Sequence, residues 1–558
     1  MKTFTQSLLD SYREVPDQVA ITLLQSGLPD QSITYRQLLC GSCGYAQAFS
    51  KSGILPGEVA IVILQHGADL LYAFFGAILH GAIPSIMPFL TEKLSPNHYR
   101  RSLEALFEVT APAAVITYRD FSAEVDQARA NTPSVRVVLV SEDVHPVQNP
   151  EINSLSGLQR LPEDIVLLQH SSGTTGLQKG VALSHAAVFN QLESYARALR
   201  LDSRDVVVSW LPLYHDMGLI AGFILPILKR TPLVMMSPFD WVRAPYRLLQ
   251  AVSQHNGTLS WLPNFAYNFC AQKIRDRDLE GVDLSSWRAV INCSEPMYWQ
   301  SHQMFLQRFQ PYGLRPQALG TCYAMAENVF AVTQGGVDSP VTVDPVDQTS
   351  LLTRQVAEPV KDESGAVKML STGPPIDNTR VRIVDPQGRD LPERHLGEIA
   401  LLSDCMLTGY YQRPDLTEKA FIDGWFLTGD LGYMASGEVY ITGRKKDLII
   451  VGGKNVYPQD LERLACEVSG VHPGRTVAFG VFNQQAGTED VAVIAEMDES
   501  DPDRRLEIAN LICERVTRGS DVALRYAHVV ERGWLLKTSS GKIARSANRD
   551  KFLTERSV

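Results

Sequence analysis

Short runs of β-branched and other apolar residues alternate with longer helical patterns through roughly the first 440 residues of this 558-residue chain. Such alternation is typical of repeated βαβ units, which build mostly parallel sheets with helices on their faces. The predicted strands in this part include residues 59–64, 113–117, 135–140, 206–209, 289–292 and 381–385. We therefore predict an α/β fold with stacked, mostly parallel sheets.

A different organisation begins near Gly443, where a polar, charged segment is followed by the apolar run 448–451. The rest of the chain has the pattern of a compact α+β unit. We predict helices at 459–468 and 503–517 and strands at 476–481 and 490–496. The chain thus divides into a large N-terminal domain, residues 1–446, and a small, mobile C-terminal domain, residues 447–558.

The composition excludes some classes of function. A net charge of −10 argues against a nucleic-acid-binding protein, because phosphate backbones require a basic surface. The first residues lack the apolar core of a signal peptide, and the most hydrophobic region, 59–90, is interrupted by histidines, prolines and an aspartate. The scattered cysteines suit a reducing compartment. We expect a cytoplasmic protein without a membrane span.

One loop, residues 171–180, has the composition of a phosphate-binding site. It follows the apolar run 165–168. Its glycines let the backbone approach a phosphate closely, and its lysine supplies positive charge to neutralise that phosphate. The spacing of Gly173 and Gly176 differs from that of a Walker loop. We predict that it joins two strands, the second at 180–184. Its candidate phosphate-binding residues are Ser171, Ser172, Gly173, Thr174, Thr175, Gly176 and Lys179.

Other segments combine hydroxyl, carboxylate and aromatic residues beside predicted strands. His215 has three open interpretations: a catalytic base, a gate to an apolar pocket, or a buried structural histidine. Glu327 is a natural Mg²⁺ ligand beside a triphosphate, and Asp430 is suited to ribose hydroxyls. Lys542 lies in a Ser/Gly turn of the other domain, so it serves the same site only if the small domain closes over the large one.

Together and in order, these segments resemble the adenylate-forming superfamily of acyl-CoA synthetases, adenylation domains and luciferases, over essentially the whole chain. The resemblance gives the loop at 171–180 the family's phosphate-binding role, with Gln178 where proline is usual. Further matches imply roles in nucleotide binding, metal binding, domain rotation and catalysis. In chain order these matches are Ser294, Glu295 and Pro296 (adenine), Thr321 (phosphate), Tyr323 (aromatic turn), Glu327 (Mg²⁺), Asp430 (ribose), Arg444 (nucleotide), Asp447 (hinge) and Lys542 (catalytic lysine).

Within the superfamily the chain looks most similar to the fatty acyl-AMP ligases. The histidine motif at 210–220 and the pair Glu295-Pro296 follow their pattern, and 334–370 lies where they carry an inserted segment that disfavours the CoA-bound conformation. Residues 453–457 and 405–411 look more like CoA synthetases, and Ala324 replaces a usual glycine.

The resemblance implies an enzyme that uses ATP and Mg²⁺ to convert a carboxylic acid to acyl-AMP with release of pyrophosphate. We expect this acid to be a fatty acid. The acyl group then passes to the phosphopantetheine thiol of an acyl carrier protein. The alternative is an acyl-CoA or aryl-CoA ligase; a catalytically silent relative and a luciferase-like oxygenase are less favoured. Several apolar residues are candidates either for an acyl tunnel or for ordinary core, namely Met217, Phe239, Trp241, Phe265, Tyr267 and Phe269.

Overall fold

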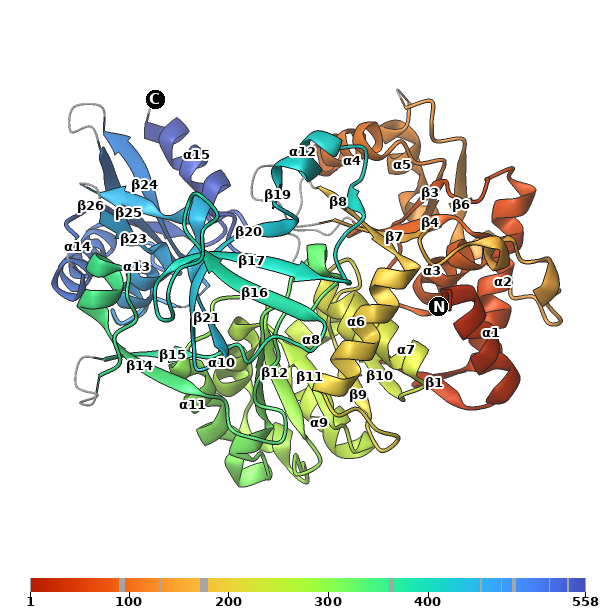
Figure 1. Cartoon of the computed structure of the whole chain (residues 1–558), viewed down its shortest axis with the longest axis horizontal. Coiled ribbons are helices and arrows are strands. Elements are labelled where there is room, and N and C mark those ends of the chain that lie inside the picture. Colours follow the sequence, from red (N-terminus) through yellow and green to blue (C-terminus); the bar gives the residue numbers. More distant parts are fainter. Residues whose placement is uncertain are drawn as a thin grey trace.

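The structure is a computed structural model that describes residues 2–89, 96–130, 132–170, 179–360, 366–451, 454–472, 474–483, 488–520, 522–538 and 541–556. Figure 1 shows the C-terminal elements, in blue, at one end of the molecule and the N-terminal elements, in red and orange, at the other. The predicted α/β class is confirmed, with a separate β-rich C-terminal region.

The N-terminal part contains a parallel sheet with strand order β4-β3-β5-β6. Its strands are β3 (Val59–Val62), β4 (Ile83–Ile86), β5 (Ala114–Thr117) and β6 (Val137–Val140). The helices of this part are α1 (Phe4–Glu14), α2 (Tyr35–Lys51), α3 (Ala68–His80), α4 (Pro96–Thr110) and α5 (Ser122–Ala128). The three strands predicted from the first apolar runs are confirmed, each slightly shorter than predicted.

The second sheet has the order β13-β12-β11-β9-β10-β1-β2, and its pairs are parallel except β1 with β2. Its strands are β1 (Val19–Leu24), β2 (Gln31–Thr34), β9 (Val207–Ser209), β10 (Leu233–Met236), β11 (Leu259–Leu262), β12 (Ala289–Cys293) and β13 (Leu319–Cys322). The helices between these strands are α6 (His185–Ala198), α7 (Leu225–Lys229), α8 (Pro238–Arg243), α9 (Tyr246–His255), α10 (Asn264–Lys273) and α11 (Trp299–Phe309).

Antiparallel pairs make up the middle of the chain. β7 (Ile165–His170) and β8 (Gly180–Ser184) pair as predicted around the loop, and β18 (Gly409–Tyr410) joins β8. A hairpin pairs β14 (Val343–Asp347) with β15 (Ala366–Leu370). A further sheet and one helix complete this part, comprising β16 (Thr379–Val384), β17 (Gly397–Ser403), β19 (Phe421–Ile422), β20 (Trp425–Ala435), β21 (Glu438–Arg444) and α12 (Pro414–Lys419).

The strand predicted at 381–385 was wrongly assigned to a parallel sheet. It forms β16, which pairs antiparallel with β17. The chain turns back at Asp385, whose carbonyl accepts the Gly388 amide at 2.9 Å. No helical crossover lies between the two strands in this described stretch, and a parallel pair requires such a crossover.

The C-terminal region contains β22 (Ile449–Val451), β23 (Lys454–Val456), β24 (Thr476–Asn483), β25 (Thr488–Met497) and β26 (Leu524–Glu531), with α13 (Pro458–Ala465), α14 (Pro502–Gly519) and α15 (Arg545–Arg556). The predicted strands at 476–481 and 490–496 and both predicted helices are confirmed. An apolar cluster of its own begins at Ile449 and includes Leu461 and Ile512.

Helix starts follow local capping chemistry. Thr34 and Gln37 form a reciprocal pair of side-chain-to-backbone hydrogen bonds at the start of α2. The Ser184 hydroxyl accepts the Ala187 amide at 3.1 Å, as predicted for the cap of α6. Among the helices that the structure describes, none combines the length and the apolar character needed to cross a membrane.

Candidate functional site

The candidate site lies where neighbouring parallel strands end. His215 follows β9, Ser294 follows β12, and Tyr323 follows β13. These strands lie in the order β13-β12-β11-β9 and run the same way. Their carboxyl ends therefore meet at one edge of the sheet, the usual place for ligands in open α/β sheets.

The phosphate loop is only partly visible in this geometry. Ser171, Ser172, Gly173, Thr174, Thr175 and Gly176 lie outside the described residues. Lys179, directly before β8, is described, and its Nζ lies 4.5 Å from the ring centroid of Tyr410. The Tyr410 hydroxyl donates a hydrogen bond to Glu327 Oε1 at 2.9 Å. Tyr410 thus brings Lys179 and Glu327 together, although they are distant in the sequence.

The carboxyl group of Glu327 is partly buried, and burial raises its pKa above the usual range. The hydrogen bond from Tyr410 and the positive charge of Arg444 oppose that rise, since both favour the charged form. Among the described residues, no group of three or more histidine, cysteine, aspartate or glutamate side chains is arranged to hold a metal ion.

Asp430, Tyr323 and Arg444 form a compact polar set. Asp430 and Arg444 lie opposite each other on β20 and β21, with 3.0 Å between Asp430 Oδ1 and Arg444 Nε. The Tyr323 hydroxyl donates to Asp430 Oδ2 at 2.7 Å. Burial raises the pKa of Tyr323 well above its usual value, so the hydroxyl remains a donor at neutral pH. The structure therefore joins three residues predicted separately.

His215 and Asp216 lie side by side after β9, with 2.6 Å between His215 Nδ1 and Asp216 Oδ1. Burial alone would raise the pKa of Asp216, but His215, Lys542 and the Met217 amide outweigh burial, and the pKa of Asp216 is lowered. The Met217 amide donates to Asp216 Oδ1 at 2.8 Å. Asp216 is therefore a carboxylate beside His215, at the start of the π-helical segment Met217–Ile224.

Lys542 reaches this edge of the sheet from the C-terminal region. Burial among protein atoms lowers its pKa, while the carboxylates of Asp216 and Glu295 raise it. Its side chain retains partial solvent contact. This lysine of the C-terminal region and the carboxylates of Asp216 and Glu295 thus share one electrostatic environment.

The segment Ser294, Glu295 and Pro296 follows β12 with an unusual backbone. Ser294 has φ of 71°, in the left-handed region that serine rarely adopts and that often marks a functional site. Glu295 Oε2 accepts the Phe265 amide at 2.9 Å, and burial raises the pKa of Glu295. Pro296 is exposed.

Thr321 lies within β13 and is fully buried. Its hydroxyl donates to the Ser371 carbonyl oxygen at 2.8 Å. That hydroxyl is therefore engaged with the protein backbone.

Asp447 lies between the two parts of the chain, directly after Lys445 and Lys446. Its Oδ2 is 2.9 Å from Nη1 of Arg545, at the start of α15. Arg545 Nη2 also donates to Glu462 Oε1 on α13 at 2.7 Å. The predicted hinge residue is thus ion-paired to the segment that carries Lys542.

The candidate acyl residues have different environments. Trp241 is fully buried and contacts Phe265 and Phe269. Tyr267 is ordinary core, since its hydroxyl donates to the Val290 carbonyl at 2.7 Å. Phe239 is exposed on α8.

Sequence reasoning missed three residues of this site: Tyr410, Glu398 and the role of Asp216. Glu398 Oε2 is 2.7 Å from Lys445 Nζ, and its Oε1 accepts the Gly429 amide at 3.1 Å. Glu398 thereby connects β20, at the residue before Asp430, to the segment that leads into Asp447. The position of Tyr410 after an apolar segment was the one available signal, and it did not distinguish a site residue from core.

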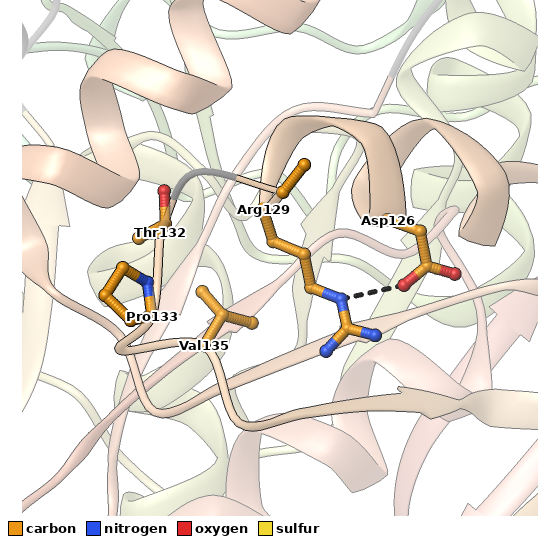
Figure 2. Close-up of a pocket in the computed structure, with 6 residues that line it drawn as sticks. Asp126, Arg129, Thr132, Pro133 and Val135 are labelled. Atoms are coloured by element: carbon orange, nitrogen blue, oxygen red, sulfur yellow. Dashed lines mark hydrogen bonds and ion pairs between the residues drawn. The ribbon is translucent and has the colours of Figure 1, made fainter.

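A surface hollow of about 540 Å³ lies elsewhere, at the end of α5 and the start of β6. Figure 2 shows Arg129 beside it, with Nε 2.8 Å from Asp126 Oδ1. Its lining contains none of the predicted site residues.

Known proteins resemble this chain in sequence and in structure. A curated relative, the medium-chain-fatty-acid–[acyl-carrier-protein] ligase JamA of Moorena producens (strain JHB), is 32% identical over 96% of this chain and 92% of its own length. The long-chain-fatty-acid–AMP ligase FadD26 of Mycobacterium tuberculosis (strain ATCC 25618 / H37Rv) is 30% identical over 97% of this chain and 95% of its own.

A solved structure from work on the fatty acyl-adenylate ligases of E. coli and L. pneumophila superimposes with a TM-score of 0.89 and 25% identity, covering 99% of this chain and 98% of that one. The sequence pattern of the AMP-binding enzyme family matches residues 9–411. The chain belongs to the AMP-binding enzyme family.

Proposed function

We propose that this enzyme uses ATP to convert a fatty acid to acyl-AMP with release of pyrophosphate, and then transfers the acyl group to the phosphopantetheine thiol of an acyl carrier protein. The observation that carries the proposal is the position of Lys542. This lysine comes from the C-terminal region, yet the carboxylates of Asp216 and Glu295 in the large domain act on its pKa.

The residues have complementary roles in this proposal. The loop Ser171–Gly176 and Lys179 bind the phosphates, with Thr321 supporting them from β13. Tyr323, Asp430 and Arg444 bind the nucleoside, and the adenine lies against Ser294, Glu295 and Pro296. Contacts between these residues support this assignment of roles. They are the Tyr323–Asp430 hydrogen bond, the Arg444–Asp430 ion pair, and the contacts of Tyr410 with Lys179 and Glu327.

The chemical step joins two anions, because a carboxylate oxygen attacks the α-phosphorus while pyrophosphate leaves. Positive charge must therefore lie between the reactants in the transition state. Lys542 supplies it, and Asp216 and Glu295 favour its charged form. His215 lies against Asp216. In this proposal His215 orients the carboxylate of the incoming fatty acid.

Magnesium fits the residues in a specific way. Glu327 is a single carboxylate near Lys179 and Tyr410, and Mg²⁺ characteristically takes one or two protein carboxylates plus phosphate oxygens and water. Glu327 would hold the ion, which would supply neutralisation of the phosphate charge.

For the second half-reaction we propose that residues 447–558 rotate as a body relative to residues 1–446 about Asp447. The separate apolar cluster that begins at Ile449 supports this boundary. The acceptor is the finer part of the proposal, and free CoA is the alternative, with acyl-CoA or aryl-CoA ligase activity. We also propose a cytoplasmic location, which agrees with cysteines that are all free thiols.

The test supplies purified enzyme with ATP, Mg²⁺ and fatty acids of increasing length, then with CoA or with holo acyl carrier protein. Acyl-AMP and thioester are followed separately by mass spectrometry. We expect acyl-AMP to accumulate with CoA and to be consumed with the carrier protein. Rapid acyl-CoA formation would select the alternative, and no acyl-AMP from any fatty acid would refute the proposal.

A further inference from the structure

The carboxyl group of Glu398 uses each of its two oxygens for a different segment of the chain. Oε1 accepts the Gly429 amide at 3.1 Å, and Oε2 lies 2.7 Å from Lys445 Nζ. The Glu398 side chain is 9% exposed, so these two contacts largely replace water around its carboxyl group. Gly429 directly precedes Asp430, and Lys445 directly follows Arg444. Both partners therefore adjoin the polar set of the site.

Gly429 lies in an irregular part of β20. The register of β17 against β20 shifts here, so residues 428–430 of β20 lie opposite Ile399 alone. Such a bulge takes backbone groups out of the regular ladder, and those groups then need other partners. Gly429 has φ of 73°, in the left-handed region that favours glycine. Its amide finds its acceptor in the side chain of Glu398.

A second side chain completes this bulge. The Thr428 hydroxyl donates to the Ile399 carbonyl oxygen at 2.8 Å and accepts the Asp430 amide at 3.0 Å. Thr428 and Glu398 together thus satisfy backbone groups on both sides of Gly429. Loss of the Glu398 acceptor would leave the Gly429 amide without its partner, and the bulge would relax to find another. The position of the Asp430 carboxylate therefore depends on Glu398.

Lys445 is the first residue beyond the sheet on the way to the C-terminal region. Strand β21 ends at Arg444, and the proposed hinge residue Asp447 follows shortly after. The Lys445 side chain is 54% exposed, and its ion pair with Glu398 ties this start of the linker to β17. A hinge works through a few residues whose backbone angles change while their neighbours stay fixed. Glu398 supplies such a fixed point on the large-domain side.

We propose that Glu398 is a positioning residue for both half-reactions. Through Oε1 it holds the bulge that presents Asp430 to the nucleotide, and through Oε2 it holds Lys445 as the stationary end of the hinge. This inference rests on the proposed function and adds a residue that acts through Asp430 and Lys445 rather than on the substrate itself. The two roles use different oxygens, so substitutions can separate them.

The experiment measures KM for ATP and kcat in ATP–pyrophosphate exchange, and single-turnover acyl transfer to the thiol that wild-type enzyme uses, holo acyl carrier protein or CoA. Glu398→Ala removes both contacts and should raise KM for ATP about tenfold, with a smaller change in kcat, and slow transfer about three- to tenfold. Glu398→Gln keeps an acceptor oxygen for Gly429 and should restore KM to within about threefold of wild type, while transfer stays slow. Lys445→Gln should slow transfer by the same factor and leave KM within about twofold.

Arg382→Gln is the matched control, because it breaks an ion pair with Asp390 on the same sheet but outside the linker, and it should match wild type in both measurements. Thermal unfolding shows whether each variant is folded, and Glu398→Met, similar in size, replaces Glu398→Ala if that variant is not.

A wild-type KM for ATP in the variant without an acceptor, or a raised KM that Glu398→Gln fails to restore, overturns the role at Asp430. Wild-type transfer in Lys445→Gln overturns the role at the hinge. Failure of wild-type enzyme to form acyl-AMP from any fatty acid counts instead against the proposed function.

Discussion

The molecule contains two aspartate–tyrosine–arginine sets with nearly the same chemistry and different surroundings. In the site, Asp430 accepts from Tyr323 at 2.7 Å and pairs with Arg444 at 3.0 Å. Away from it, Asp344 on β14 accepts from Tyr433 at 2.8 Å and from Arg394 at 3.0 Å. Both aspartate side chains are 9% exposed.

The arginines differ. The Arg394 side chain is 28% exposed and also donates to the Ala357 carbonyl at 2.9 Å, and the set lies beside the apolar cluster of Tyr433 and Tyr440. The Arg444 side chain is 54% exposed. One set joins parts of the fold, whereas the other leaves the Arg444 cation exposed, as the proposed nucleotide site requires.

The largest expected effect comes from Lys542, whose pKa is also influenced by Arg444. Lys542→Ala should slow ATP–pyrophosphate exchange by about 100-fold or more, because loss of a transition-state charge contact costs ~3 kcal/mol. Lys551→Ala is the matched control, since Lys551 Nζ binds the Trp534 carbonyl on the same domain. Near wild-type exchange in the Lys542 variant would remove that lysine from the chemistry.

Paired substitutions test the two aspartates directly. Asp430→Asn should raise KM for ATP about 10- to 100-fold, as expected for a charge-assisted contact of ~1.5–3 kcal/mol, with little change in melting temperature. Asp344→Asn should do the reverse, lowering the melting temperature while KM for ATP stays near wild type. Steady-state kinetics and calorimetry decide the matter, and equal effects of the two variants on KM would end the distinction.

Asp447 lies three residues after Arg444 in the sequence. Rotation of residues 447–558 about Asp447 should therefore leave Asp430, Tyr323 and Arg444 in place and move Lys542 away from them. Asp447→Pro restricts that rotation and should reduce thioester formation about tenfold while adenylation stays within about twofold of wild type. Asp447→Ala removes only the ion pair to Arg545 and serves as the control. Single-turnover measurement of each half-reaction gives the answer; equal loss of both contradicts a hinge.

The smallest effect concerns Tyr410. Its hydrogen bond favours the charged form of Glu327, so Tyr410→Phe should raise the pKa of Glu327 further above its usual value. When the pH is lowered, activity that needs the charged form of Glu327 should therefore be lost at a higher pH in this variant than in wild type. Profiles of kcat/KM for ATP between about pH 5 and 9 should show that shift. Tyr411→Phe is the neighbouring control, and an unmoved acid limb would separate Tyr410 from Glu327.

Much of the fold followed from the sequence, because alternating apolar runs report strands and helices locally. The direction in which strands pair was harder to predict. β16 has the composition of a parallel strand, but the turn at Asp385 reverses the chain direction, so β16 pairs antiparallel with β17. Local pattern does not report which distant strand becomes the neighbour.

The same limit applies to the site. Asp430, Arg444 and Lys542 were identified by motif, but their mutual contacts depend on tertiary structure. Tyr410 was not identified, since its role arises only when β18 pairs with β8 beside Lys179. Glu398 lies between Gly397 and Ile399, and nothing in that sequence context identifies it as a residue of the site.

The ion pair between Asp447 and Arg545 has a kinetic consequence. Arg545 lies shortly after Lys542, so the proposed pivot, Asp447, and the proposed catalytic lysine are joined through one short segment. On the proposed function, the lysine must leave before a thiol arrives and must return before the next ATP reacts. Each turnover then includes one complete excursion of the small domain, and the steady-state rate has that excursion as its upper bound.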